Sequence, residues 1–271
     1  MTQPHREFSE AFDDYHVVHA GFLYPERKHW FHRELSQVGV HKYQIIESQP
    51  TASDDLRLDR FAATHTNSGA ILSVTDAIRR SMTKAYDDGL ESVCLFEDDI
   101  VFRDSFRTGW SEVQREVEQI DWDVLFFYRW HFVPIVESSS PVRLVPIEET
   151  FCTHAMAVRR RAFQGVQAAL DHAVAAGTAH DTPPFFQCLR SRGYKTFATT
   201  QNLVGQGAGL TSGLSQVVRG TNKTDVFRVR HPLDFRWHAR DGLFRLRRLK
   251  NQVLGRTRAL VSSRDASERP G

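Results

Sequence analysis

Apolar and polar positions at the start of the chain follow the pattern of a strand, a helix and a second strand. Residues 15–20 are a short apolar stretch that predicts a strand. Residues 25–38 predict a helix, because large apolar side chains recur there at helical spacing and Pro25 suits a first helical turn. Residues 42–47 predict the second strand. The chain therefore opens with a βαβ unit, the building block of parallel sheets.

The alternation of strands and helices continues along most of the chain. Further helices are predicted at 67–87, 107–119, 160–176 and 183–192, and further strands at 92–96, 122–128, 142–147, 151–158 and 194–199. Residues 48–60 are expected to be irregular, and the glycine-rich residues 205–215 to form a loop. This order predicts an α/β fold, in which a mostly parallel central sheet is flanked by helices, within one domain over residues 1–235.

The charge distribution separates a mildly acidic body from a basic tail. The chain has 35 Lys and Arg against 33 Asp and Glu, yet residues 236–271 hold ten Lys or Arg and only three Asp or Glu. Leucines at helical spacing within 243–261 predict a basic amphipathic helix, which lies on an anionic membrane or packs against the body or a second subunit. An acidic body is not typical of nucleic-acid binders, so no nucleic-acid partner is expected.

Cysteine usage and hydropathy are typical of a cytoplasmic protein. Cys94, Cys152 and Cys188 are odd in number and widely spaced, which favours reduced thiols over a disulfide framework or a zinc site. The sequence has no run of about 20 apolar residues, and residues 1–14 lack the apolar stretch of a signal peptide. We expect a cytoplasmic location, peripheral at the inner face of the membrane if the tail binds there.

Three consecutive carboxylates, Glu97, Asp98 and Asp99, follow directly on the apolar strand predicted at 92–96. Side chains alternate along an extended chain, so Glu97 and Asp99 are expected to face one way and Asp98 the other. The carboxyl end of a parallel strand is where open α/β sheets bind ligands. Carboxylate oxygens suit Mg²⁺ or Mn²⁺, and such an ion offsets both the repulsion between the carboxylates and the charge of a diphosphate.

A solvated acidic turn that caps the next helix is the other interpretation of the three carboxylates. The strand before them is continuously apolar, as in strands buried on both faces, and apolar residues resume at 100–102. This context favours a ligand site over a solvated turn.

Residues 95–102, Leu-Phe-Glu-Asp-Asp-Ile-Val-Phe, resemble the acidic signature of glycosyltransferase family 25. That family includes bacterial lipooligosaccharide galactosyltransferases and procollagen galactosyltransferases. Weaker resemblances to its other motifs follow in the family's order, at residues 67–73, 153–162, 180–186 and 201–215. The sequence departs from the family's pattern at Val74, where His is usual, and at Asn202, where Pro is common.

The resemblance implies a GT-A fold, a Rossmann-like sheet that uses a nucleotide-sugar donor and Mn²⁺ or Mg²⁺. A UDP-sugar is the expected donor, and the named family members imply galactose as a candidate sugar. Transfer would invert the anomeric centre, and the acceptor would be a hydroxyl of a glycan or a lipid-linked saccharide. On this resemblance Asp99 holds the metal ion with the help of Glu97, directly or through water, and Asp98 meets the ribose or a backbone amide.

Further site residues are implied by their positions relative to the family's motifs. Asp181 is expected to be the base that takes the acceptor proton, or else only the N-cap of the helix that follows. His231 is a candidate for the C-terminal histidine that binds the metal in many GT-A enzymes. Ala20, Gly21 and Arg27 lie after the first strand, where GT-A folds hold the nucleotide. Arg27 is expected either to pair with a phosphate or to be a surface charge.

Other residues carry weaker expectations. His154 is expected to contact substrate or to lie in the core. The pair at 130–131, Trp-His, is expected to line the acceptor site or to pack in the core or at an interface. Residues 205–213 are expected to form a lid over bound donor or a surface loop.

Two other function classes fit the acidic cluster less well. A nucleotidyltransferase normally carries a glycine-rich phosphate-binding loop after the first strand, and residues 21–25 are not such a loop. A degenerate relative that only binds glycans or acts as a scaffold is expected to have lost its metal ligands, whereas Glu97, Asp98 and Asp99 are intact. The leading hypothesis is a metal-dependent, inverting glycosyltransferase.

Overall fold

The computed structural model describes residues 7–62, 68–104, 106–128, 141–148, 150, 154–180 and 182–206. These residues belong to one compact unit, residues 1–228. The domain boundary that we predict at residue 235 and the basic tail beyond it lie outside the described residues, and both stay predictions.

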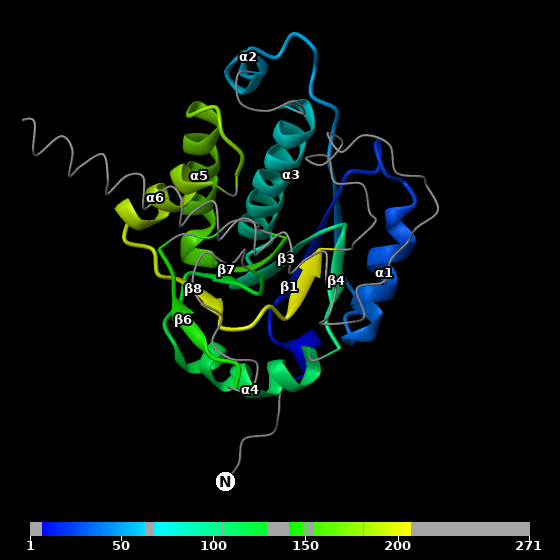
Figure 1. Cartoon of the computed structure of the whole chain (residues 1–271), viewed down its shortest axis with the longest axis vertical. Helices are drawn as coiled ribbons and strands as arrows, with labels where there is room; N and C mark the ends of the chain where they lie inside the picture. The colour runs from blue at the N-terminus through cyan, green and yellow to red at the C-terminus, as the bar shows by residue number, and fades with distance from the viewer. Residues whose placement is uncertain are drawn as a thin grey trace, which may run out of the picture. The chain divides into compact units, whose positions relative to one another are not determined.

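A seven-stranded sheet forms the centre of the described residues (Figure 1). Its strands are β1 (Asp14–His19), β2 (Gln44–Glu47), β3 (Ser92–Glu97), β5 (Val124–Phe126), β6 (Leu144–Pro146), β7 (Ala155–Arg159) and β8 (Thr196–Thr199), in the order β2-β1-β3-β7-β5-β8-β6. β1 pairs in parallel with β2 and β3, and β5 with β8, whereas β7 and β6 run against their neighbours. Five of the seven strands thus share one direction, which confirms the prediction of a mostly parallel sheet.

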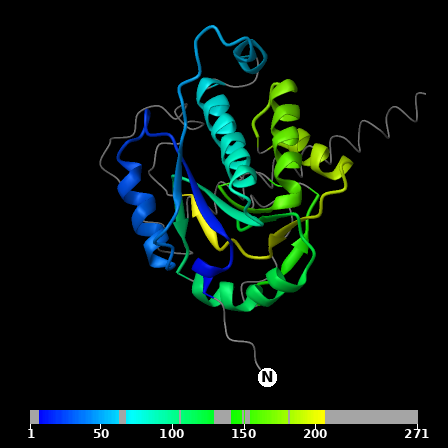
Figure 2. The same cartoon turned by 180° about the vertical axis from the view of Figure 1, so that it is seen from behind.

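Helices cover both faces of this sheet (Figures 1 and 2). One face is covered by α1 (Arg27–Gln37), α4 (Phe106–Gln119) and the short 3₁₀ turn Phe8–Glu10. The other face is covered by α3 (Ser68–Asp87), α5 (Phe163–Ala175) and α6 (Pro183–Ser191). The α/β architecture with a Rossmann-like sheet flanked by helices is therefore confirmed.

The central strand β3 is apolar throughout because it is buried from both faces. Cys94 and Phe96 pack into the core on the α1 and α4 side, whereas Val93 and Leu95 pack into the core under α3 and α5. All four side chains are fully buried. The strand leaves this double core at Glu97, which puts the acidic residues at the edge of the sheet.

Helix ends occur where the sequence predicts them. Gly39 follows α1 and Gly89 follows α3, and both adopt a positive φ (82° and 75°) that favours glycine. The βαβ unit at the start of the chain is confirmed as well, since β1 and β2 pair in parallel on either side of α1.

The strand predicted at 194–199 is followed by a further strand, which the sequence analysis does not predict. This strand, β9 (Val204–Gln206), pairs antiparallel with β4 (Ile100–Phe102), which begins directly after the acidic residues. Residues 205–206 therefore belong to a strand and not to the predicted glycine-rich loop, whose remaining residues lie outside the described ones. A three-residue strand that pairs across about 100 residues leaves no local signal in the sequence.

The prediction of irregular chain over residues 48–60 is wrong at its end, where α2 (Arg57–Ala62) begins. The Asp55 carboxylate accepts a hydrogen bond from the Arg57 backbone N–H at 2.9 Å. The Arg57 side chain also pairs with Asp55 and, at 2.9 Å, with Asp76 of α3. These contacts stabilise a short helix in a segment whose polar composition resembles a loop.

α6 begins one residue later than the predicted cap implies. Thr182, not Asp181, is the N-cap residue, and Pro183 is the first residue of the helix. The residue before a proline avoids the helical conformation, and Thr182 is accordingly extended (φ −116°, ψ 167°). Asp181 itself lies outside the described residues.

Gly109 in α4 occupies a position where a side chain does not fit. A Cβ there would lie 2.4 Å from Leu203 Cδ2 and 3.1 Å from Val142 Cγ2, and both neighbours are buried. Gly109→Ala is expected to lower the free energy of unfolding in urea by about 1–2 kcal/mol, because overpacking costs more than the helix propensity of alanine returns. Gly69→Ala is the matched control, since its Cβ would lie no closer than 3.9 Å to a neighbour. Equal losses in the two variants would contradict the packing argument.

Candidate functional site

The acidic residues occupy the turn at which β3 leaves the sheet. Glu97 is the last residue of β3, and Asp98 and Asp99 connect it to β4. Asp98 and Asp99 are each only 3% exposed. The interpretation of the cluster as a solvated acidic turn is therefore excluded, and each buried carboxylate has to be offset by its surroundings.

Asp98 binds the end of β1 and the chain that follows it. Its Oδ2 accepts hydrogen bonds from the backbone N–H of Ala20 at 2.9 Å and lies 2.8 Å from His19 Nδ1. Its Oδ1 pairs with Arg27 Nη1 at 2.5 Å. We predict that Asp98 meets either the ribose or a backbone amide, and the structure shows the second of these contacts, with the Ala20 N–H.

Arg27, at the start of α1, is buried and held on two sides. Its guanidinium lies 3.7 Å from Asp99 as well as beside Asp98, and it stacks on the Tyr24 ring at 4.0 Å. Burial lowers the pKa of Arg27, but the attraction of Asp98 and then of Asp99 outweighs it and leaves the pKa above its ordinary value. Arg27 thus stays a cation inside the protein and is not a surface charge.

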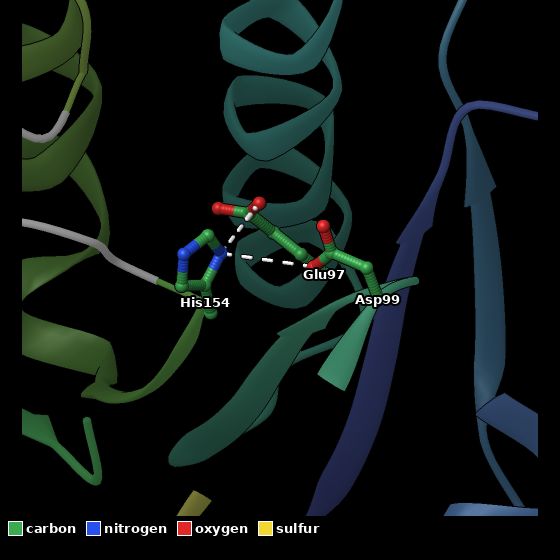
Figure 3. A group of neighbouring side chains, drawn as sticks. All are labelled: Glu97, Asp99 and His154. Atoms are coloured by element: carbon green, nitrogen blue, oxygen red, sulfur yellow. Dashed lines mark hydrogen bonds and ion pairs between the residues drawn. The ribbon is translucent and has the colours of Figure 1, made fainter. Parts of the chain in front are cut away.

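Glu97 and Asp99 both point toward His154 (Figure 3). His154 Nδ1 lies 2.8 Å from Glu97 Oε2 and 3.8 Å from Asp99 Oδ1. His154 immediately precedes β7, and its carbonyl accepts a hydrogen bond from the Glu97 backbone N–H at 2.9 Å. The antiparallel pairing of β3 with β7 thus brings the carboxyl end of one strand beside the start of the other.

The two carboxylates of this group differ in electrostatic environment. Burial raises the pKa of Glu97, yet ion pairing and hydrogen bonding with His154, and further with His180, bring it well below its usual range. Burial raises the pKa of Asp99 too, and the neighbouring charges of Glu97 and Asp98 keep it raised against the opposing effect of His154 and Arg27. Glu97 is a stable anion, while the charged form of Asp99 is disfavoured until a further cation arrives.

The donor atoms of Glu97, Asp99 and His154 fit a divalent metal ion. One ligand atom from each residue can be chosen so that all three lie within 4.8 Å of one another. Two carboxylate oxygens and one imidazole nitrogen suit Mn²⁺ and similar ions, and the imidazole makes the group less suited to Mg²⁺. The net negative charge of the two carboxylates is also what a divalent cation would offset.

A pocket adjoins this group and extends toward the loop between β1 and α1. One wall comes from Ala20, Arg27 and the loop between them, and the opposite wall comes from the first turns of α3, including Ile71 and Val74. Glu97, His154 and His180 also line the pocket. The pocket thus brings carboxylate and imidazole groups together with apolar side chains of α3 and with the β1–α1 loop.

The predicted donor-binding residues of the β1–α1 loop line or border this pocket. Ala20 is buried and gives its N–H to Asp98. Gly21 follows it, and a Cβ there would lie 2.9 Å from Glu47 Oε2 and 3.0 Å from His19 Nε2, so a side chain at this position would require the exposed Glu47 to move. Contact of Ala20, Gly21 or Arg27 with a nucleotide stays a prediction.

Three predictions concern residues outside the described part of the chain. Asp181 as base, His231 as metal ligand, and residues 130–131 at an acceptor site all fall there and stay predictions.

The thiols of Cys94 and Cys188 are both free, as predicted, while Cys152 lies outside the described residues. Among the described helices, none is long and apolar enough to cross a membrane.

The sequence analysis did not assign His154 to the metal-ligand group and did not single out His180 at all. His180 lines the pocket, and its Nε2 lies 3.6 Å from Glu97 Oε1. The signal in the sequence is that His154 lies in the strand predicted at 151–158 and His180 lies between two predicted helices. With histidine so common in this sequence, 13 in all, that signal is weak.

Comparisons with known proteins found a similarity in structure, but none to a family model or to a curated sequence. A solved structure, of a glycosyltransferase involved in the glycosylation of the major capsid of PBCV-1, is similar over 74% of this chain and 95% of its own length, with 13% sequence identity and a TM-score of 0.40. A likeness of this degree concerns the path of the chain and says nothing of activity.

Proposed function

We propose that this protein is a metal-dependent glycosyltransferase, which moves a sugar with inversion from a UDP-sugar to a hydroxyl of a glycan or lipid-linked saccharide. The observation that carries the proposal is the group of Glu97, Asp99 and His154 at the carboxyl end of β3, beside a pocket that the β1–α1 loop also lines. A sugar nucleotide has a diphosphate that requires a cation and a nucleoside that requires a neighbouring cleft. The chain offers residues for both, next to each other.

The roles of the residues follow from their contacts. When bound, Mn²⁺ or Mg²⁺ supplies positive charge to the diphosphate leaving group. Glu97, Asp99 and His154 would hold that ion, and the imidazole nitrogen favours Mn²⁺ of the two. Asp98 has a separate role, because its bonds to His19, Ala20 and Arg27 keep the β1–α1 loop beside the ion's ligands.

The proton of the acceptor hydroxyl needs a base, for which Asp181 remains our proposal. Asp181 follows His180 in the sequence, and His180 lines the pocket. His231 remains the proposed additional metal ligand. A lipid-linked acceptor would suit the proposed binding of the basic residues 243–261 to an anionic membrane surface.

Calorimetric titration of UDP, with and without Mn²⁺, tests this function directly. We expect UDP to bind the wild type in the presence of Mn²⁺. Omission of Mn²⁺, or the substitution Asp99→Ala, is expected to weaken binding by at least about 100-fold, because a metal ligand is lost and not merely a residue that supports one. Asp171→Ala is the control, since Asp171 lies on the exposed side of α5 and pairs only with surface groups such as Arg79.

UDP binding that is equal with and without Mn²⁺, and equal in Asp99→Ala, would contradict the assignment of the acidic group. Absence of UDP binding in the presence of Mn²⁺ would exclude the UDP-sugar version of the proposal. The Asp171→Ala control separates either result from a general effect of removing a carboxylate.

A further inference from the structure

We propose that His180, held in place by Thr75, is a positioning residue that fixes the Glu97 carboxylate for metal binding. This inference rests on the proposed function, because it concerns the same metal site. It assigns a role to two residues that lie outside the group of Glu97, Asp99 and His154.

The two oxygens of Glu97 face two different histidines. Oε2 lies 2.8 Å from His154 Nδ1, on the side shared with Asp99. Oε1 lies 3.6 Å from His180 Nε2, on the other side. If the Glu97 carboxylate rotated, at least one of its oxygens would lose its contact with a histidine ring. His180 therefore restrains the rotation of the carboxylate that presents Oε2 to the metal site.

His180 itself is oriented from behind by α3. The Thr75 hydroxyl lies 3.1 Å from His180 Nδ1 and 2.8 Å from the Ile71 carbonyl oxygen of the same helix. Thr75 is fully buried and His180 is 8% exposed, so this link is protected from water. One ring nitrogen is held by a hydroxyl that is itself bonded to a backbone carbonyl, while the other nitrogen faces the Glu97 carboxylate. Residues around a metal site set the orientation of its ligands through contacts of this kind.

α3 makes a second buried contact between a hydroxyl and a histidine, and this one involves neither Glu97 nor His180. His16 Nδ1 of β1 lies 2.7 Å from the Ser81 hydroxyl of α3, and both residues are fully buried. Loss of the Ser81 hydroxyl thus removes a buried histidine–hydroxyl contact of α3 without touching Glu97. Ser81→Ala is therefore the control for every general effect on this helix.

The test is titration of Mn²⁺ alone into the full chain, with the free ion followed by its electron paramagnetic resonance signal. We expect His180→Leu to weaken Mn²⁺ binding about 10- to 100-fold and Thr75→Val by roughly 10-fold, the range found for residues that support metal ligands. His180→Gln keeps a polar atom near Glu97 and is expected to recover most of the affinity. Ser81→Ala should bind Mn²⁺ like the wild type. Thermal unfolding of each metal-free variant accompanies the titration.

Each outcome decides the proposal. Reduced Mn²⁺ affinity in Thr75→Val and His180→Leu, with recovery in His180→Gln and no change in Ser81→Ala, supports it. If His180→Leu does not fold, Thr75→Val carries the test, because valine has nearly the shape of threonine. Wild-type affinity in Thr75→Val and His180→Leu, or equal losses in Ser81→Ala, overturns the positioning role alone. Failure of the wild type to bind Mn²⁺ overturns the metal site of the proposed function and this inference with it.

Discussion

Replacement of Asp98 by alanine is expected to lower the free energy of unfolding by about 3–5 kcal/mol, as for other buried ion pairs that lose one partner. Asp98 and Arg27 are 3% and 4% exposed, and their atoms lie 2.5 Å apart. Without Asp98, the buried Arg27 cation loses the carboxylate that lies 2.5 Å away, and the Asp99 carboxylate lies farther away, at 3.7 Å. The Ala20 N–H loses its acceptor at the same time. Denaturation in urea measures the loss.

Asp88→Ala is the control for this prediction. Asp88 follows the last residue of α3 and pairs at 2.9 Å with Lys84, which lies one helical turn before it. Both side chains are more than one third exposed. Such a pair contributes no more than about 0.5 kcal/mol, because water screens both charges. A loss for Asp98→Ala as small as that for Asp88→Ala would contradict the role of Asp98 as the buried counterion of Arg27.

Asp99→Asn is expected to act in opposite directions on stability and on metal binding. In the metal-free protein the raised pKa of Asp99 reflects the cost of a buried carboxylate beside Glu97 and Asp98. A neutral amide of the same shape avoids that cost, so we expect the metal-free variant to be more stable than the wild type by on the order of 1 kcal/mol. The same change removes a charged side chain of the proposed metal site and is expected to weaken Mn²⁺ binding by at least about 100-fold.

Thermal unfolding with and without Mn²⁺ measures both effects of Asp99→Asn in one experiment. The wild type should gain about 2.7 kcal/mol at an Mn²⁺ concentration 100 times the dissociation constant, and the variant should gain almost nothing. A variant that is less stable than the wild type without metal, yet still gains stability from Mn²⁺, would show that Asp99 has a structural role instead of binding metal.

The sequence was sufficient to predict the elements that depend on local pattern. The first βαβ unit, the helix starting at Ser68 and the buried strand ending at Glu97 all follow from apolar spacing and from glycine at helix ends. The prediction that Glu97 and Asp99 share one side is confirmed, since both contribute to the group with His154.

Features that depend on pairing between distant segments could not be predicted. His154 reaches Glu97 because β7 runs antiparallel to β3. The apolar residues of β7 predict a strand, but they predict neither its direction nor the strand with which it pairs. His180 reaches the same carboxylate from across 83 positions, through the packing of α5 and α6 beside α3. The burial of Asp98 could not be predicted either, because it depends on the β1–α1 loop, whose Ala20 N–H bonds to the Asp98 carboxylate.

The place of β7 in the sheet has a consequence for folding kinetics. β7 lies between β3 and β5 and bonds to both, so the N-terminal strands β2-β1-β3 and the later strands β5-β8-β6 meet only through it. Contacts between segments so distant in sequence form slowly, because loop closure has to precede them. Glu97, Asp99 and His154, the proposed metal ligands, lie where β3 meets β7. A ribosome-bound chain that ends before His154 would therefore already contain Glu97 and Asp99 but would not hold the ion. The group of Glu97, Asp99 and His154 is therefore complete only after β7 has paired with β3.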